Sequence, residues 1–449
     1  MKHFVVSDLH LGMGRDQTGA LHPLEDFHSD AEFERLLDLV LDARGDVIIN
    51  GDWLDFLQVE PFTVRDSIGV FLSADGIPLA YTAAEALEKL DTLFARQARH
   101  FDALASFIAA GGRLTIVQGN HDADLFFPAD AGGEPPLQAR IRQRLGRADG
   151  AALRFVEQSM RLGTVHIEHG HQRCEHVNEF QRHPDIFHPD RTTALLGTPR
   201  MELLWGSRLV MEFFNDLEVE YPFADNLKPM TRALWLGIRN GWVDGRTAGA
   251  FVRFFLGAGV PWHDVPEVLS PESDAPAVVL QRLDDPALRN LLFQRMGRDE
   301  EFQRELTETL RRAPVEEKRQ WRSSDRSATG REEVVAQGEQ GVAGAIREAR
   351  EFREAGALLE QPGVSAVLFG HTHAAIDGNA ADAKLRGYFN TGTWIPALDI
   401  ENPAIKRRLK TEEFPVQLLK DRSIFVRRLT YAEITETGGS YAVELKDLT

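Results

Sequence analysis

Cysteine is almost absent from this 449-residue sequence, and its absence limits the classes of fold that the chain can adopt. With Cys174 as the single thiol, an intrachain disulfide framework is excluded, and a reducing compartment is expected. Long apolar runs are also missing, because no stretch approaches the roughly 20 uninterrupted apolar residues that a membrane span needs. The opening residues 1–6 form too short an apolar run for a signal peptide. We therefore expect a cytoplasmic protein, with peripheral membrane contact left open.

Positive charge is scarce as well. The 51 Lys and Arg residues are outnumbered by 69 Asp and Glu residues, which gives a formal net charge of −18. A surface of this sign repels the phosphates of nucleic acid, so nucleic acid is a disfavoured partner. Apolar residues, in contrast, make up 43% of the chain. This content supports the core of one large α/β domain plus a second region.

The first candidate ligand pair follows an apolar run at the start of the chain. Residues 4–6 predict a buried strand, and Asp8 and His10 come directly after it. Residues two apart in an extended segment point to the same side, so the Asp8 carboxylate and the His10 imidazole can meet at one point. Oxygen and nitrogen ligands in this arrangement suit a divalent metal ion.

A second apolar run, residues 46–50, ends in Gly51 and Asp52, and Asp55 follows shortly after. The glycine lets the backbone come close to a ligand. Asp52 is a candidate bridging ligand, because each oxygen of one carboxylate can bind a different metal ion. Asp55 is predicted to orient a neighbouring side chain by a hydrogen bond.

The third run, residues 114–117, precedes Gly119, Asn120, His121 and Asp122. In an open α/β sheet, the end of a strand is the usual place for a site. Asn120 can offer a neutral amide oxygen to a metal ion, and His121 can offer a proton. A Gly-Asn pair is also common in ordinary turns. This stretch therefore indicates a site only in combination with the four other strand ends that carry candidate ligands.

The fourth run, residues 164–168, leads to His169 and Gly170. His169 is the candidate ligand because it lies at the end of the strand. His166 alternates away from His169 and is predicted to be a packed or solvated strand residue. For His171 three roles stay open: a metal ligand, a residue that orients a ligand, or a substrate contact.

The fifth run, residues 364–369, precedes Gly370, and His371 and His373 then present two imidazoles on one side of the chain. Further strands are predicted in residues 386–394, 423–434 and 440–445. Because these strands follow a long interruption, the domain that carries the five motifs must be built from both ends of the sequence.

Two crossover helices are predicted between the early strands. Ser29 and Glu32 have the spacing of a capping box, and apolar residues follow at helical intervals. Thr82 and Glu85 repeat that spacing at the start of a second helix, which is predicted to run to Ala110.

The periodicity changes between residues 175 and 360. Apolar and aromatic residues recur there at helical spacing, as in residues 201–205, 211–214, 233–236 and 251–255. We therefore predict a large, mostly helical insertion. Its later part, residues 311–360, mixes Arg and Glu with Gly and Ser, which is typical of a solvated helix face with mobile breaks. The aromatic residues either form the core of the insertion or line an apolar groove for a lipophilic substrate.

The five motifs are far less probable together than singly, and in this order they resemble the calcineurin-like metallophosphoesterase family. The matching residues are Asp8/His10, Gly51-Asp52/Asp55, Gly119-Asn120-His121-Asp122, His169-Gly170 and Gly370-His371/His373. The resemblance implies an α+β fold of the αββα sandwich type. Residues 1–174 and 361–449 would form the catalytic domain, and residues 175–360 would be a helical cap that the resemblance does not cover.

The resemblance also implies a metal site and a reaction. Two divalent metal ions would share one carboxylate, with the ligands Asp8, His10, Asp52 and His373 for one ion and Asp52, Asn120, His169 and His371 for the other. His121 would be the proton donor or phosphate-binding group, oriented by Asp122. Mixed nitrogen and oxygen ligation suits Mn²⁺, Fe, Zn²⁺, Co²⁺ or Ni²⁺. The implied function is hydrolysis of a small-molecule phosphodiester or phosphomonoester by a metal-bridging hydroxide.

Three alternatives stay open. The stretches around Asp8 and Asp52 look somewhat like the branch that contains the UDP-diacylglucosamine pyrophosphohydrolases, which would make the substrate a lipid-linked nucleotide sugar. That branch usually has arginine where this chain has His121, and its insertion is smaller. A nuclease is disfavoured by the acidic composition. A non-catalytic scaffold would be expected to lose ligands or His121, whereas this chain keeps all of them.

The position of the insertion suggests what it does. It begins just after His171 and ends shortly before His371, so both of its ends are predicted to emerge beside the metals. A cap anchored there can select among substrates by contacts far from the phosphorus. The candidate contacts are the aromatic residues Trp205, Phe213 and Phe214, with Arg173 and Arg208 as candidates for binding a second phosphate.

Overall fold

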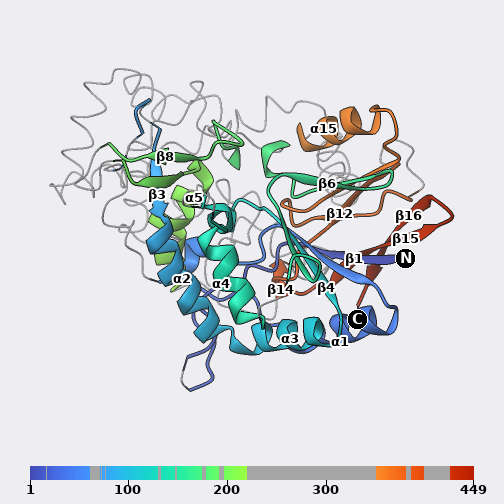
Figure 1. Ribbon diagram of the computed structural model, residues 1–449, viewed down its shortest axis with the longest axis horizontal. Coiled ribbons are helices and arrows are strands. Elements are labelled where there is room, and N and C mark those ends of the chain that lie inside the picture. Colours follow the sequence, from blue (N-terminus) through green and yellow to red (C-terminus); the bar gives the residue numbers. More distant parts are fainter. Residues whose placement is uncertain are drawn as a thin grey trace, which may run out of the picture. The chain divides into compact units, whose positions relative to one another are not determined.

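The computed structural model describes residues 1–16, 18–60, 71, 73–75, 77–129, 133–146, 149–173, 178–191, 197–219, 350–380, 386–398 and 425–448 (Figure 1). The chain divides into two compact units. The first unit comprises Met1–Met211, Arg347–Ala397 and Val426–Thr449, and it contains all five motifs. The second unit comprises Glu212–Ile346 and Leu398–Phe425. Its described residues include the short helix α6, Asn215–Glu218.

A six-stranded sheet lies at the centre of the first unit, in the order β16-β15-β1-β2-β4-β5. Its strands are β1 (Lys2–Val6), β2 (Asp46–Asn50), β4 (Arg113–Val117), β5 (Leu153–Val156), β15 (Thr430–Thr437) and β16 (Ser440–Asp447). Strands β1, β2, β4 and β5 pair in parallel, whereas β15 pairs antiparallel with both β1 and β16. The carboxyl ends of parallel strands meet at one edge, so the residues that follow β1, β2 and β4 are brought together.

A five-stranded sheet has the order β11-β12-β10-β7-β6. Its strands are β6 (Ser159–Leu162), β7 (Val165–Glu168), β10 (Ala366–Phe369), β11 (Ala375–Ile376) and β12 (Tyr388–Thr391). Strand β10 pairs in parallel with both β7 and β12. The segments that follow β7 and β10, which carry the last two motifs, therefore lie side by side.

Alternating side chains of the strands build two cores. Phe4 and Val6 of β1 belong to one core, which they share with residues of α1 (Asp30–Asp42) such as Phe33. Val5 belongs to a second core, where the six-stranded sheet meets Ile167 and Leu368 of the five-stranded sheet. The two sheets thus pack face to face, with α1 on the far side of the first. Helix α15 (Arg350–Leu359) packs against β10 and β12 (Figure 1).

The two predicted capping boxes have different outcomes. At α2 (Ala83–Arg96) the box forms, because the Thr82 hydroxyl accepts the N–H of Glu85 and the Glu85 carboxylate accepts the N–H of Thr82. At α1 it does not form, since the side chain of Ser29 caps no backbone N–H. The Ser29 hydroxyl instead accepts a hydrogen bond from Nη1 of Arg427, at 3.0 Å.

The single helix predicted from Thr82 to Ala110 is two helices, α2 and α3 (Ala98–Ala109), separated at Gln97. Gln97 is buried, and its Nε2 donates to the carboxylate of Glu25 at 2.7 Å and to the carbonyl of Gly12 at 3.2 Å. These tertiary contacts hold the side chain at the break. A fourth helix, α4 (Pro136–Arg144), follows later in the chain.

The start of the predicted helical insertion contains strands. β8 (Phe187–Pro189) and β9 (Pro199–Glu202) form a three-stranded sheet with β3 (Leu79–Thr82). Buried Arg200 supports this sheet by ion pairs with Asp190 at 3.2 Å and Glu85 at 2.9 Å. The helix predicted from the apolar spacing of residues 201–205 is therefore wrong at its start, where β9 is a strand. Its pairing partner β3 is remote in sequence, so the local spacing could not indicate it.

The remaining described elements are short. They are the 3₁₀ turns η1 (Phe56–Gln58), η2 (Ala123–Phe126) and η3 (His171–Arg173), helix α5 (Trp205–Leu209), the π-helical turn η5 (Val210–Phe214), and strands β13 (Ala397–Leu398) and β14 (Phe425–Val426). Residues 220–349, which include most of the predicted insertion, and the side chains of Trp205 and Phe213 lie outside the described part of the protein. No helix among the described residues is long and apolar enough to cross a membrane.

His100 of α3 generates a testable pH dependence. Its ring stacks on Phe33 with centroids 4.3 Å apart, and its Nε2 accepts the indole N–H of Trp53 at 3.0 Å. Burial lowers the pKa of His100 to about 3. The ordinary pKa of histidine is about 6.5, so between these values the unfolded chain binds more protons than the folded one. His100 therefore makes the protein less stable as the pH falls through this window.

We predict that His100→Gln removes this part of the acid sensitivity, because a glutamine oxygen can accept from Trp53 without titrating. The free energy of unfolding should be measured in urea at several pH values, in metal-free buffer. Below pH 6.5, the parent should lose stability relative to the variant by up to about 1.4 kcal/mol per pH unit. Parallel pH profiles for the two proteins would show that His100 titrates normally.

Candidate metal centre

The predicted ligands lie on unusual backbone. Among the described residues, six non-glycine residues have a positive φ, and five of these six are predicted metal ligands: Asp8 (53°), His10 (47°), Asp52 (50°), His371 (67°) and His373 (58°). This left-handed region costs roughly 1–2 kcal/mol for a residue with a side chain. Such strain persists only where the surroundings enforce it, and it is typical of functional sites.

Buried carboxylates hold two of the loops that carry predicted ligands. The carboxylate of Asp8 accepts the N–H of His371 at 3.0 Å, and Oδ1 of Asp52 accepts the N–H of His121 at 2.9 Å. Gly119 permits the second contact, because a Cβ at this position would lie 2.1 Å from Oδ1 of Asp52. Each carboxylate therefore fixes a loop that belongs to another strand.

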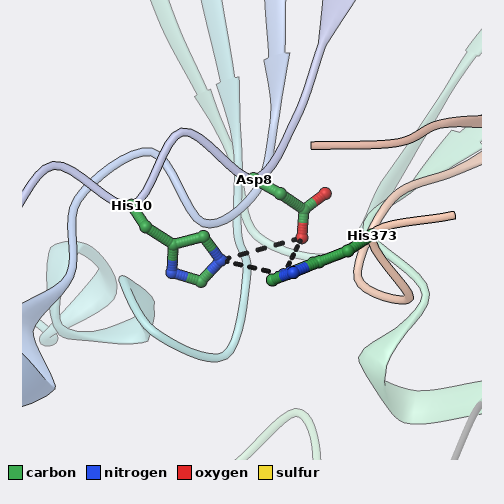
Figure 2. A group of neighbouring side chains, drawn as sticks. All are labelled: Asp8, His10 and His373. Carbon is green, nitrogen blue, oxygen red and sulfur yellow. Dashed lines mark hydrogen bonds and ion pairs between the residues drawn. The ribbon is translucent and has the colours of Figure 1, made fainter. Parts of the chain in front are cut away.

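The first group of ligand atoms comprises Asp8, His10 and His373, whose ligand atoms lie within 4.8 Å of one another (Figure 2). The Nε2 atoms of His10 and His373 are 3.2 Å apart. Oδ1 of Asp8 lies 3.9 Å from the former and 3.4 Å from the latter. The three side chains come from the segment after β1 and from the loop after β10, and they converge on one point.

The second group comprises Asp52, His169 and His371, within the same 4.8 Å limit. Nε2 of His169 lies 3.0 Å from Oδ2 of Asp52. Nδ1–H of His169 donates to the carbonyl of Asn50 at 2.8 Å, which orients the ring so that Nε2 faces the carboxylate. Oδ2 of Asp52 is also 3.7 Å from Nε2 of His10. Asp52 thus lies between the two groups, as a bridging ligand must.

Asn120 and His171 are buried side chains whose polar atoms lack partners. Within the described part of the chain, neither Oδ1 of Asn120 nor either ring nitrogen of His171 makes a hydrogen bond. A buried oxygen in this state costs free energy unless a ligand satisfies it, and a metal ion is a ligand that could do so for Asn120. The ring of His171 lies 5.5 Å from that of His169 and 6.3 Å from that of His371.

Asp55, rather than the predicted Asp122, orients His121. Nδ1–H of His121 donates to Oδ2 of Asp55 at 2.8 Å, and Nδ1–H of His10 donates to the same oxygen at 3.1 Å. These two hydrogen bonds account for the closeness of Asp55, His10 and His121, which form a third group within 4.8 Å. Asp122 accepts the N–H groups of Gly119 at 2.7 Å and Trp53 at 2.8 Å. Its carboxylate therefore holds the backbone and not the imidazole.

The electrostatics of the site favour a cation. Burial opposes ionisation of Asp52, but the neighbouring His169 and His121 hold the pKa of Asp52 well below its ordinary value. Burial also opposes a charged imidazole, yet Asp52 raises the pKa of His169 to about 10. Without metal, protons on the imidazoles balance the buried carboxylates. A divalent ion can replace those protons, because it binds neutral imidazole and ionised carboxylate.

Sequence reasoning missed two residues beside the ligands. Nδ2 of Asn178 lies 3.3 Å from Nε2 of His371, although Asn178 follows no predicted strand and no sequence signal marks it. Ser7 donates its hydroxyl to Oδ2 of Asp8 and lies 2.6 Å from Oγ1 of Thr391. Ser7 did carry a signal, since it is a polar residue between a buried strand and a ligand.

A scan against protein-family models matched none of them, and a search of curated proteins found no match.

The position of Asp52 generates a prediction about metal content. If Asp52 bridges the two groups, Asp52→Asn should lower the affinity for both metal ions, whereas His10→Ala should chiefly affect one. Elemental analysis of stripped and reloaded protein should give about two ions per chain for the parent, about one for His10→Ala, and fewer for Asp52→Asn.

His166→Gln is the matched control, because the imidazole of His166 is buried on β7 but binds Glu168 at 2.7 Å and belongs to neither group. This variant should keep the metal content of the parent. An Asp52→Asn protein that holds both ions as tightly as the parent would refute the bridging role.

Proposed function

We propose that this protein is a metal-dependent phosphoric ester hydrolase with two divalent ions. The observation that carries the proposal is the pair of ligand groups that meet at Asp52, with the imidazole of His121 beside them. Two adjacent ions with nitrogen and oxygen ligands are a recurring solution for in-line displacement at phosphorus. The donor set favours Mn²⁺, Fe, Zn²⁺, Co²⁺ or Ni²⁺.

Two groups of ligand atoms and Oδ1 of Asn120, which is unpartnered among the described residues, support the following assignment of ligands. Asp8, His10 and His373 would hold one ion, and Asp52, Asn120, His169 and His371 would hold the other, with Asp52 in contact with both. The bound pair would supply a nucleophilic water of lowered pKa and positive charge for the phosphoryl oxygens. The protein contributes placement, since buried carboxylates bind the backbone of His371 and of residues next to Asp52 and Asn120.

His121 is the proposed proton donor. Its ring packs edge-on against His10 with centroids 4.6 Å apart, and its side chain is 17% exposed, so substrate can reach it. Nδ1–H is bound to Asp55, which leaves Nε2 to carry the transferable proton. Burial opposes the charged ring, but Asp55 and Asp52 raise the pKa of His121 to about 9. A protonated His121 can donate from Nε2 to the leaving oxygen as the phosphorus–oxygen bond breaks.

The substrate is proposed only as a class, a phosphodiester or phosphomonoester. A lipid-linked pyrophosphate would need an apolar groove in the insertion, and residues 220–349 lie outside the described part of the chain. The proposal is tested by assaying stripped protein, reloaded with Mn²⁺, on aryl phosphate mono- and diesters and on nucleotide and lipid pyrophosphates. Turnover that requires the metal supports the proposal, and a folded, metal-loaded protein that hydrolyses none of them contradicts it.

The role of His121 generates a prediction about leaving groups. His121→Ala should lower kcat by a factor of about 10² to 10⁴ for esters with poor leaving groups, which need a proton. The loss should shrink for activated aryl esters, whose leaving oxygen is stable without one. Rates should be compared across a series of aryl diesters with leaving groups of different pKa.

Metal content should be unchanged in His121→Ala, because neither of the two metal groups includes this side chain. Asp55→Asn should show the same dependence on leaving group, since Asp55 orients His121; because Asp55 also binds His10, rates of this variant are compared at full metal loading. An equal loss across the series would indicate that His121 positions the phosphate instead of donating a proton.

A further inference from the structure

Helix α15 carries a buried acid with no role in the proposed reaction. Glu351 is 5% exposed and lies on the same face as Ala355 and Leu358, which pack toward the five-stranded sheet. Its Oε1 accepts a hydrogen bond from the hydroxyl of Tyr388, and Nδ2 of Asn390 lies 3.3 Å from the same oxygen. Burying a carboxylate costs free energy unless hydrogen-bond partners compensate. The partners of Glu351 therefore indicate its role.

The partner Asn390 leads from α15 to a ligand loop. Nδ2 of Asn390 donates to the carbonyl of Gly370 at 2.7 Å and approaches Oγ1 of Thr372 at 3.0 Å. Gly370 and Thr372 flank His371. Glu351 adds to the orientation of this amide, whose Oδ1 also accepts the N–H of Gly392 at 2.9 Å, because a flipped amide would place its oxygen against the Glu351 carboxylate and the Gly370 carbonyl. A path of hydrogen bonds thus joins α15 to the two residues that flank His371.

A second contact leads from α15 to the other loop of the same metal group. Nη1 of Arg173 lies 3.2 Å from Oε2 of Glu354 on α15, and Nε of Arg173 binds Glu168, the residue before His169. The N–H of Arg173 donates to the carbonyl of Gly170 at 2.9 Å, which closes the turn after His169.

A third contact holds the segment that approaches His371 from the side. Nη1 of Arg350, at the start of α15, lies 2.7 Å from Oε2 of Glu179, and Nη2 lies 3.4 Å from Oε1. Glu179 is adjacent to Asn178, whose Nδ2 lies 3.3 Å from Nε2 of His371. Glu354 of this helix therefore contacts the loop after His169 directly, whereas Glu351 and Arg350 reach the surroundings of His371 through Asn390 and through the segment of Asn178.

We propose that α15 positions the ligands of the second metal ion, with Glu351 as the main positioning residue. The inference rests on the proposed metal centre but not on its reaction. In the second group, His169 and His371 both lie on loops bound to α15. In the first group only His373 does, because Asp8 and His10 follow β1 in the other sheet. Loosening α15 should therefore lower the affinity for the ion of the second group more than the affinity for the ion of the first.

The test is a calorimetric titration of stripped protein with Mn²⁺, which resolves two affinities in the parent. Glu351→Ala removes one partner of the Asn390 amide, which keeps its bonds to Gly370 and Gly392. It should weaken binding of one ion by about tenfold, the lower end of the effect of losing a direct partner of a metal ligand, while the affinity for the other ion changes by less than about threefold. Glu351→Gln keeps a carbonyl oxygen that accepts from Tyr388 and Asn390, and it should restore most of the affinity. Glu360→Ala removes an exposed carboxylate just beyond α15 and is the matched control.

The outcomes separate this proposal from the proposed function. A parent protein that binds no Mn²⁺ contradicts the metal centre itself. A Glu351→Ala protein that binds both ions as the parent does, or that loses both equally together with its thermal stability, overturns the role of α15.

If Glu351→Ala fails to fold, variants that reverse the charges of Arg350 and Glu179 test the same proposal. Arg350 and Glu179 are partly exposed, with side-chain exposures of 28% and 32%, so single reversals leave the core intact. Arg350→Glu and Glu179→Arg should each lower the affinity for the ion that Glu351→Ala affects. The double variant, in which the two charges are exchanged, should regain that affinity. Unchanged metal affinities in both single variants would contradict the proposal.

Discussion

The site depends on buried carboxylates that each bind the loop of a different strand. Asp8 accepts the N–H of His371, Asp52 accepts the N–H of His121, and Asp55 accepts both His10 and His121. One of these bonds holds His371, whose left-handed backbone is otherwise disfavoured, and the others fix the backbone of His121 and the rings of His10 and His121. The carboxylates also concentrate negative charge where water is excluded. Such buried charge costs free energy unless cations or protons compensate it. The same contacts therefore fix the shape of the site and create its demand for positive charge.

Strand topology brings these carboxylates within reach of their partners. Asp8 and His371 are 363 residues apart, yet both follow strands whose ends point toward the same region, one in each sheet. The two sheets share a core of alternating residues such as Val5 and Ile167, so a shift between them would move one half of the ligand set against the other. Close packing resists such a shift, and the trailing strands β15 and β16 lock the C-terminal part of the chain onto β1. Helix α15 adds contacts on the outer side of the second sheet.

Local sequence patterns predicted the ligand-bearing strand ends because an apolar run followed by glycine and a polar residue is a local signal. The same patterns failed where a tertiary partner decides. The helix through Gln97 breaks because Gln97 binds Glu25 and Gly12, and the segment around Met201 pairs with β3 instead of forming a helix. Asp122 was expected to orient His121, but spacing along the chain could not reveal that Asp55 reaches the ring from the neighbouring loop. Glu351 had no local signal, since an acid in the first turn of an amphipathic helix is ordinary.

The proposed pair of metal ions that share Asp52 can be observed by electron paramagnetic resonance of stripped protein titrated with Mn²⁺ to full loading. Adjacent ions bridged by one carboxylate should couple magnetically, so the signal of isolated Mn²⁺ should give way to that of a coupled pair as the second ion binds. A fully loaded, folded protein that still shows only magnetically isolated Mn²⁺ would contradict the proposed pair.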